Sequence, residues 1–147
     1  MDMSAVREAI ADAARAVTLP EGLAQLTATG YVPDAVTVPC FFPADYTVDY
    51  DRAMNRGLDR VELTCQVLVG IADDRAAQRL LDSLLSGSGP ASLKQAIEAA
   101  RGAPGQPALG GAADDLHVTR LQGYRWYEHQ GTTYLGGQLT INIIGEG

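Results

Sequence analysis

A glycine- and serine-rich stretch at residues 86–95 has the composition of a phosphate-binding loop and reads SGSGPASLKQ. A Walker-type loop requires a second glycine five positions after the first, then lysine and a hydroxyl residue, so that backbone amides and an ammonium group surround the phosphates. Counted from Gly87, these positions hold Ser92, Leu93 and Lys94. A dinucleotide-binding loop also requires glycine at position 92 and a preceding strand, whereas a leucine-striped helical pattern precedes this stretch. Both nucleotide-binding patterns therefore fail.

The same stretch has all the signals of a connection between two helices. Gly87 is expected to adopt the left-handed conformation after the first helix, and Pro90 suits the first turn of the second. Ser92 and Gln95 have the spacing of a capping box. We therefore predict a helix stop followed by a helix start.

Two other sets of residues have side chains that bind metals. Asp45, Asp49 and Asp51 would offer oxygen ligands to calcium, but the glycine and glutamate of an EF-hand loop are missing, and strand alternation explains their spacing. His117 and His129 lack both the helical spacing of a zinc protease pair and a CxxC partner. No metal site is predicted.

Nucleophilic catalysis is also not indicated. Cys65 lies in a strongly alternating apolar row, where a thiol is more often inert core than a reactive group. With Cys40 it makes two cysteines, which we expect to be buried and reduced. Ser86 occupies the place of the first glycine that a nucleophile elbow requires. We expect neither enzymatic activity nor a cofactor.

Composition favours one compact domain over residues 1–147. Hydrophobic residues make up 46% of the chain, which is enough for a core. The net charge of −7 and the pI near 4.6 disfavour nucleic acids and anionic membranes as partners. The first 17 residues carry acids and arginines unlike a secretory signal, and no apolar run approaches a membrane span. We expect a soluble protein made in a cytoplasm.

Hydrophobic periodicity predicts three helices and several strands. The helices span 4–17 with Ser4 as N-cap, Asp73 or Asp74 to Leu85, and 93–100. Strands are expected near 23–31, 36–42, 45–51, 61–71, 116–128 and 132–145. A glycine- and proline-rich segment at 101–115 reads as a mobile loop.

The order of these elements is not the regular alternation of a doubly wound parallel sheet. We predict an α+β fold with a mixed, mainly antiparallel sheet and helices packed on one face. The last strand alternates Leu139, Ile141 and Ile143 with polar residues, as antiparallel pairing requires. Gly136 and Gly137 are expected to bend this strand or to admit a neighbouring backbone.

Residues 41–60 combine aromatic side chains, a methionine and arginines in or beside a long hairpin. These residue types are enriched at protein interfaces. The alternative for Phe41 and Phe42 is that they cover the domain's own core.

Several ordered motifs between residues 46 and 145 resemble the small tail terminator proteins of long-tailed bacteriophages that infect actinobacteria. They are RG.DR, VLVG, DDR, GSGP.S.K.AIEA and YLGG. No single motif is specific, but their order is. The first 45 residues match the family less well.

This resemblance implies a structural virion protein at the head-proximal end of the tail. Such proteins form a homohexameric ring on the last ring of tail tube protein, end tube polymerisation and join the tail to the head completion or stopper protein of the connector. Genomic double-stranded DNA would pass through the ring without specific binding, and no membrane is involved. The predicted subunit or tube contacts, which the resemblance itself does not assign, are Tyr46, Tyr50, Arg52, Met54, Arg56 and Asp59.

Three alternatives remain at this point. The closest is a head completion or stopper protein of the connector, which has similar size and ring symmetry. A small-molecule-binding enzyme using the loop at Gly87 is another. The third is an interaction domain that forms no ring.

Overall fold

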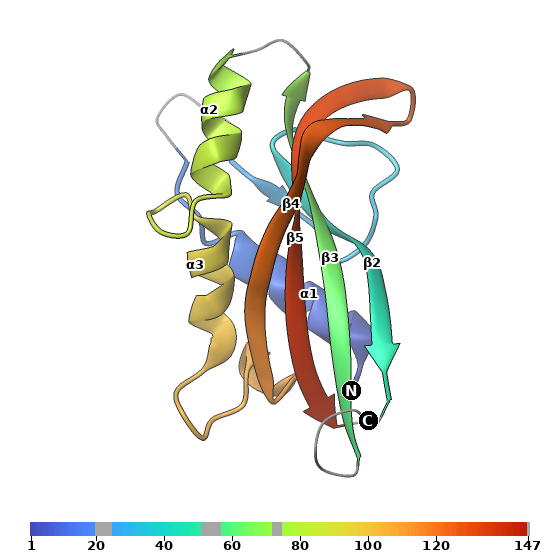
Figure 1. Ribbon diagram of the computed structural model, residues 1–147, viewed down its shortest axis with the longest axis vertical. Coiled ribbons are helices and arrows are strands. Elements are labelled where there is room, and N and C mark those ends of the chain that lie inside the picture. Colours follow the sequence, from blue (N-terminus) through green and yellow to red (C-terminus); the bar gives the residue numbers. More distant parts are fainter. Residues whose placement is uncertain (20–24, 51–56, 72–74, 147) are drawn as a thin grey trace.

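The computed structural model describes residues 1–19, 25–50, 57–71 and 75–146 (Figure 1). Within these residues, five strands form one sheet in the order β1-β2-β3-β5-β4, in which only β1 and β2 pair in parallel. The predicted α+β fold with a mainly antiparallel sheet is thereby confirmed. The strands are β1 (Thr27–Ala28), β2 (Cys40–Asp49), β3 (Leu58–Ile71), β4 (Asp115–His129) and β5 (Thr132–Glu146). The helices are α1 (Met3–Ala14), α2 (Arg75–Leu84) and α3 (Leu93–Glu98), with short 3-10 turns η1 (Ala99–Arg101) and η2 (Leu109–Gly111).

The three α-helices pack on one face of the sheet, as predicted, and α1 crosses behind the strands in the view of Figure 1. Alternate residues of β3 and β5 supply the sheet side of this core, because successive strand side chains point to opposite faces. Leu63 and Ile141 are both fully buried there. The leucine stripe of α2 supplies the helix side through Leu80, Leu81 and Leu84.

The other face carries a smaller apolar cluster at one end. Cys40, Phe42 and Leu68 form it, and the 29–39 loop and the tip of the β4–β5 hairpin fold over it. His129 from that tip lies 5.8 Å from Phe42 between ring centroids, and its Nε2 is 3.0 Å from the carbonyl oxygen of Pro33. Phe41 is buried in the main core, so both phenylalanines serve the domain's own packing.

The long β4–β5 hairpin confirms the two predicted C-terminal strands. Gln130 and Gly131 form its turn with φ of 51° and 81°, the two left-handed positions of the tight turn that best matches strand twist. Gly136 lies opposite Leu68 of β3, whose backbone passes so close that no side chain fits between them. The backbone that closely approaches Gly136 is therefore that of β3 in the same chain.

Several predicted elements have different bounds in the structure. Asp2, not Ser4, caps α1: its carboxylate accepts hydrogen bonds from the amides of Ser4 at 3.0 Å and Ala5 at 3.3 Å. The strands expected at 36–42 and 45–51 are one strand, β2, which continues through Pro43. A bulge between Pro43 and Asp45 accommodates the proline, which has no amide hydrogen for the ladder. The strand expected near 23–31 is reduced to β1, and its first two residues lie outside the described chain.

The loop at 86–95 does join two helices, but the roles of its residues differ from prediction. Gly89, with φ of 110°, is the left-handed residue, and Gly87 is not. Pro90 precedes the helix, which begins only at Leu93. Ser92 caps α3 by accepting from the amide of Gln95 at 3.1 Å. The side chain of Gln95 accepts from the amide of Gly89, not from that of Ser92, so the capping box is only half formed.

The glycine-rich segment after α3 is more structured than predicted. It contains η2, and Ala108 pairs with Ala113 in an isolated bridge. Ala108 and Leu109 are buried in the main core, which anchors the segment, while residues 102–107 are exposed. Two apolar side chains therefore fix a stretch whose glycine content predicts a mobile loop.

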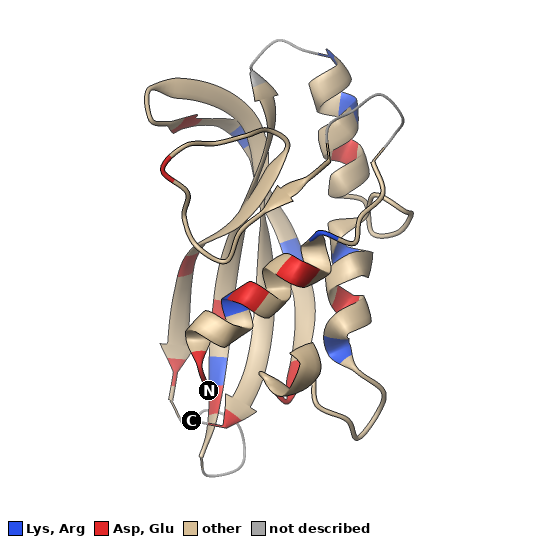
Figure 2. Cartoon of the chain, turned by 180° about the vertical axis from the view of Figure 1, so that it is seen from behind, with Lys and Arg blue, Asp and Glu red and all other residues tan. Residues whose placement is uncertain are grey.

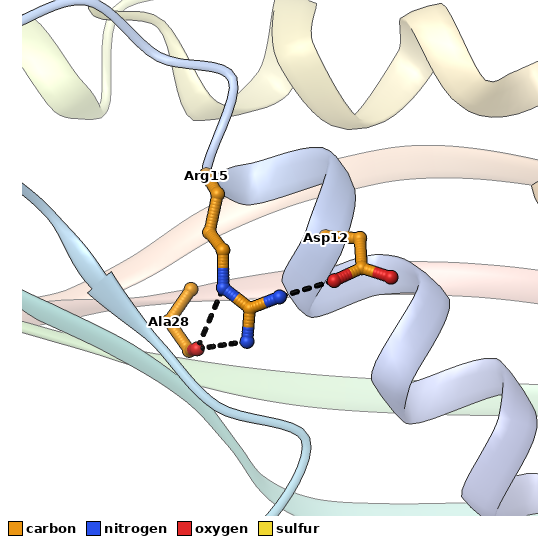
Figure 3. A network of polar contacts seen from close by, with 3 residues as sticks. All are labelled: Asp12, Arg15 and Ala28. Atoms are coloured by element: carbon orange, nitrogen blue, oxygen red, sulfur yellow. Dashed lines mark hydrogen bonds and ion pairs between the residues drawn. The ribbon is translucent and has the colours of Figure 1, made fainter.

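Arg15 closes the outer edge of β1 (Figure 3). The amide of Thr27 donates to the carbonyl of Pro39, just before β2, and that of Thr29 donates to Phe41 of β2, so the carbonyl of Ala28 faces the other way. Arg15 donates to this oxygen from Nε at 3.1 Å and from a terminal nitrogen at 2.6 Å, and it also pairs with Asp12. A side chain that occupies edge groups in this way protects them from pairing with another strand.

Replacing Arg15 with glutamine is expected to lower the free energy of unfolding by about 1.5 kcal/mol, because two charge-assisted hydrogen bonds to the Ala28 carbonyl are lost. Urea unfolding followed by circular dichroism measures the change. Arg7→Gln is the matched control, since the hydrogen bonds of Arg7 go to Met3 and Ser4 of its own helix. Equal losses in the two variants would contradict the role assigned to Arg15.

Candidate subunit interface

Two stretches of strand are open along one side in the described part of the chain. β4 is an edge strand of 15 residues that pairs only with β5. On the far side of the sheet, β1 covers β2 only at Cys40 and Phe41, which leaves Asp45–Asp49 without a neighbouring strand on that side, although the amide of Tyr46 donates to the Asp45 carboxylate at 2.9 Å. Unpaired edges are templates for pairing with another chain.

Side chains occupy hydrogen-bonding groups at the N-terminal end of β4. Asp115 accepts a hydrogen bond from the amide of Leu116 at 2.9 Å, and Arg101 Nε pairs with the same carboxylate at 2.7 Å. The Arg101 guanidinium is the largest cause that holds the pKa of Asp115 below its usual value. These contacts occupy the edge at Asp115 and Leu116, the first two residues of the strand, and the open part of β4 follows them.

A strip of large apolar side chains is exposed along this open part of β4. It consists of Leu121, Tyr124 and Trp126, which are 43%, 47% and 57% exposed, and we call it the β4 strip. Leu121 pairs with Leu139, and Trp126 with Leu135, so the strip lies on the helix side of the sheet. Exposed aromatic groups at this density are typical of interaction surfaces.

Tyr124 of the β4 strip lies beside α2. Partial burial is the largest cause that raises its pKa, and the carboxylate of Asp82 adds to the shift through its charge and a hydrogen bond. The strip was not predicted from the sequence. The available signal was the loss of alternation after Val118, where two bulges interrupt the ladder with β5.

The predicted contact residues are only partly accessible. Tyr46 in β2 and Tyr50 just after it are 42% and 74% exposed, so both are available to a partner. Asp59 in β3 is only 8% exposed, which leaves little of its surface for a partner in this conformation. The other three predicted contacts, Arg52, Met54 and Arg56, lie outside the described residues.

The sheet face opposite the helices is largely polar. Arg120 on β4 reaches across β5 to pair with Glu62 on β3 at 3.3 Å, over the buried Thr140. Gln138 donates to Gln66 at 3.2 Å, and Gln66 donates to the carbonyl of Gly137 at 3.0 Å. The described lysines and arginines are spread over several helices and strands and alternate with acidic residues (Figure 2), which is not the clustering typical of a nucleic-acid-binding protein.

The loop around Gly87 borders a depression of about 500 Å³. Its described lining includes Asp82, three serines and no lysine or arginine. The carboxylate of Asp82 would repel a phosphate, and no cation is present among these residues to offset the repulsion. The geometry thus gives no support to a nucleotide site.

The described residues considered for metal binding do not come together. Asp45 and Asp49 are exposed along the edge of β2, whereas His117 and His129 lie near opposite ends of β4. The third aspartate, Asp51, lies outside the described residues. Among the described residues, no group of three or more histidine, cysteine or acidic side chains is placed to hold a metal ion.

Both cysteine thiols are buried, and we expect them to be inert in the folded protein. Burial raises the pKa of Cys40 to about 12 and raises the pKa of Cys65 further from its ordinary value of 9.0. A thiol-reactive dye should therefore label the native chain slowly and label two thiols after unfolding. Fast labelling of the native protein would contradict this burial.

The same shift predicts a loss of stability in alkali. Above pH 9 the unfolded thiols lose their protons while the folded thiols keep them, so stability falls as pH rises towards the folded pKa values. Each thiol contributes a slope of up to about 1.4 kcal/mol per pH unit. Unfolding of wild type and Cys65→Ala at pH 8 and pH 10 measures this contribution, which the variant should reduce.

In the described part of the chain, no helix has the length and apolarity needed to cross a membrane. Comparison with protein-family models gives no match, and a search of curated proteins also gives none. The interface residues described above are therefore the basis for a functional proposal, together with the motifs of the sequence.

Proposed function

We propose that this chain is a tail terminator: a subunit of a hexameric ring that caps the tail tube of a long-tailed bacteriophage and joins it to the head. The observation that carries the proposal is the ordered motif set between residues 46 and 145. The motifs fall in elements of one sheet and its helices: RG.DR leads into β3, GSGP.S.K.AIEA spans the α2–α3 connection, and YLGG lies in β5.

The surface of the subunit supports the proposal. A ring needs two different contact surfaces on each copy, because a head-to-tail contact joins unlike patches. The open part of β4 with its strip, and the open part of β2 with Tyr46, are two such surfaces on opposite edges of the sheet. In a virion protein made in the bacterial cytoplasm, these two surfaces would be exposed only until the subunits assemble.

The charge of the chain also fits a position around a DNA channel. A net charge of −7 disfavours adhesion of the passing phosphates. In this proposal the ring binds the tail tube protein on one side and the stopper protein of the connector on the other. The chemistry is that of assembly, and the proposal includes no catalytic step and no cofactor.

The test is to delete the gene for this chain from the phage that encodes it and to image the particles by negative-stain electron microscopy. A terminator predicts tubes of excess and variable length without heads, and complementation with the wild-type chain restores normal particles. Tails of normal length beside heads that leak DNA would instead assign the chain to the connector as a stopper protein. Intact particles would refute both.

A further inference from the structure

We propose that copies of this chain join head to tail by pairing the open part of β2 of one copy with the open part of β4 of the next, in one continuous sheet. The inference rests on the proposed function in taking the assembly to be a closed ring. It goes further by naming the two edges, their register and the side chains that meet.

Strand direction is the first support. The four long strands alternate in direction across the order β2-β3-β5-β4, since each neighbouring pair is antiparallel. Rotation about an axis along the strands keeps the direction of every strand. Because there are four alternating strands, the first strand of the next copy, β2, then runs antiparallel to the last strand, β4, of the copy before it. The alternation then continues without a break around the ring.

Charge is the second support, and it distinguishes unlike edges from like ones. Strand β2 carries Asp45 and Asp49 and no basic residue. Between His117 and Tyr127, β4 carries Arg120 and Arg125 and no acidic residue. Pairing β2 with β2 or β4 with β4 would oppose like charges, whereas pairing β2 with β4 opposes unlike ones.

Register is the third support. Within one copy, the ladder places Asp45 level with Arg120. Strands in a closed barrel tilt by about 35–45°, which staggers successive strands. Four strands at about 4.8 Å spacing span about 19 Å, so a tilt of about 35° shifts the next copy by roughly 13 Å, or four residues.

With the helices outside, the right-handed coil of barrel strands moves the next copy's β2 towards the hairpin end of β4. Arg120 pairs with Thr140 of β5, and Arg125 pairs with Gly136, four positions away along β5. A shift of four residues therefore brings Asp45 of the next copy opposite Arg125. The same shift brings Asp49 opposite Arg120. An even shift keeps every side chain on its own face of the sheet.

The apolar side chains agree with this register. On the helix side, Val48 of the next copy falls opposite Leu121, and Tyr46 falls beside Tyr124. Leu121 and Tyr124 of the β4 strip would thus be covered by half-exposed groups of β2. The polar face with Glu62 and Gln66 would line the channel.

Disulfide trapping tests this register on the purified protein at high concentration, because it captures even a transient contact. Thr47 and Gln122 are exposed and fall opposite each other in the proposed pairing. Under a mild oxidant, the double variant Thr47→Cys/Gln122→Cys should form a ladder of cross-linked oligomers. A mixture of the two single variants should give dimers only, and each single variant alone should give none.

Dimers from one single variant alone would show that like edges pair, and absence of the ladder would show that these edges do not meet. Either result overturns the proposal. The native thiols do not interfere because both are buried.

Charge reversal in the double-cysteine background gives a second readout. Asp45→Arg/Asp49→Arg and Arg120→Asp/Arg125→Asp should each lower the cross-linked yield more than roughly tenfold, and mixing the two should restore it. Thermal melts confirm that each variant folds. No restoration on mixing would count against the charge pairing.

The outcome is separable from the deletion test. If cross-linked oligomers form but gene deletion leaves normal tails, the strand pairing is supported and the terminator function is refuted. If no cross-linked oligomers form but gene deletion gives overlong tails, the terminator function is supported and the strand pairing is refuted.

Discussion

Replacing Gly136 with alanine is expected to lower the free energy of unfolding by about 3 kcal/mol, at the upper end of the cost of overpacking. A Cβ at this position would lie 2.2 Å from the carbonyl oxygen of Val67 and 2.8 Å from Cδ2 of Leu68. The first of these atoms belongs to the backbone of β3, which cannot move without breaking its ladder with β5. Urea unfolding followed by circular dichroism measures the loss.

Gly87→Ala is the matched control. A Cβ at Gly87 meets nothing within 4 Å, and the residue does not have a left-handed backbone. Its unfolding free energy should stay within about 0.5 kcal/mol of wild type or rise slightly, because alanine restricts the unfolded chain. Equal losses at the two positions would show that β3 does not approach Gly136 as described.

Replacing Tyr124 and Trp126 together with serine is expected to abolish assembly while leaving the fold intact. Both side chains are about half exposed, so the core does not depend on them. Aromatic groups at the centre of an interface each contribute about 2 kcal/mol or more to binding, so the pair should lower phage titre at least about 100-fold in a complementation assay.

Gln78→Ala on the exposed side of α2 is the control and should complement fully. An unfolding curve of the serine variant close to wild type would separate an assembly defect from a folding defect. Wild-type titre from the stable serine variant would remove the β4 strip from the functional surface.

The elements predicted most accurately are those whose side-chain pattern reflects packing against a single core. The alternation of apolar and polar residues correctly predicted which faces of β3 and β5 are buried, and the leucine stripe correctly predicted the buried side of α2. These patterns persist over ten residues or more, so single exceptions do not change the interpretation.

The errors occur where one contact decides the local structure. Asp2 and Ser4 are equally suitable cap residues, and the choice between them depends on backbone geometry that composition does not encode. Gly89 replaces Gly87 as the left-handed residue for the same reason. Pro43 predicts a strand end, but a bulge allows β2 to continue through it.

The candidate interface was only partly predictable. Aromatic content near residue 46 pointed to the β2 edge, and Tyr46 and Tyr50 are indeed exposed. The β4 strip was missed because the sequence does not show which of two C-terminal strands lies at the edge. Only the order β1-β2-β3-β5-β4 places β4 outside and makes Trp126 accessible.

The most direct test of the proposed function is a cryo-electron microscopy map of the phage particle at a resolution that identifies this chain. The terminator proposal predicts six copies in one ring between the last ring of tube protein and the connector, with the sheet face that carries Glu62 and Gln66 towards the channel. Density for this chain on the head side of the connector, or no copy in the particle, would contradict it.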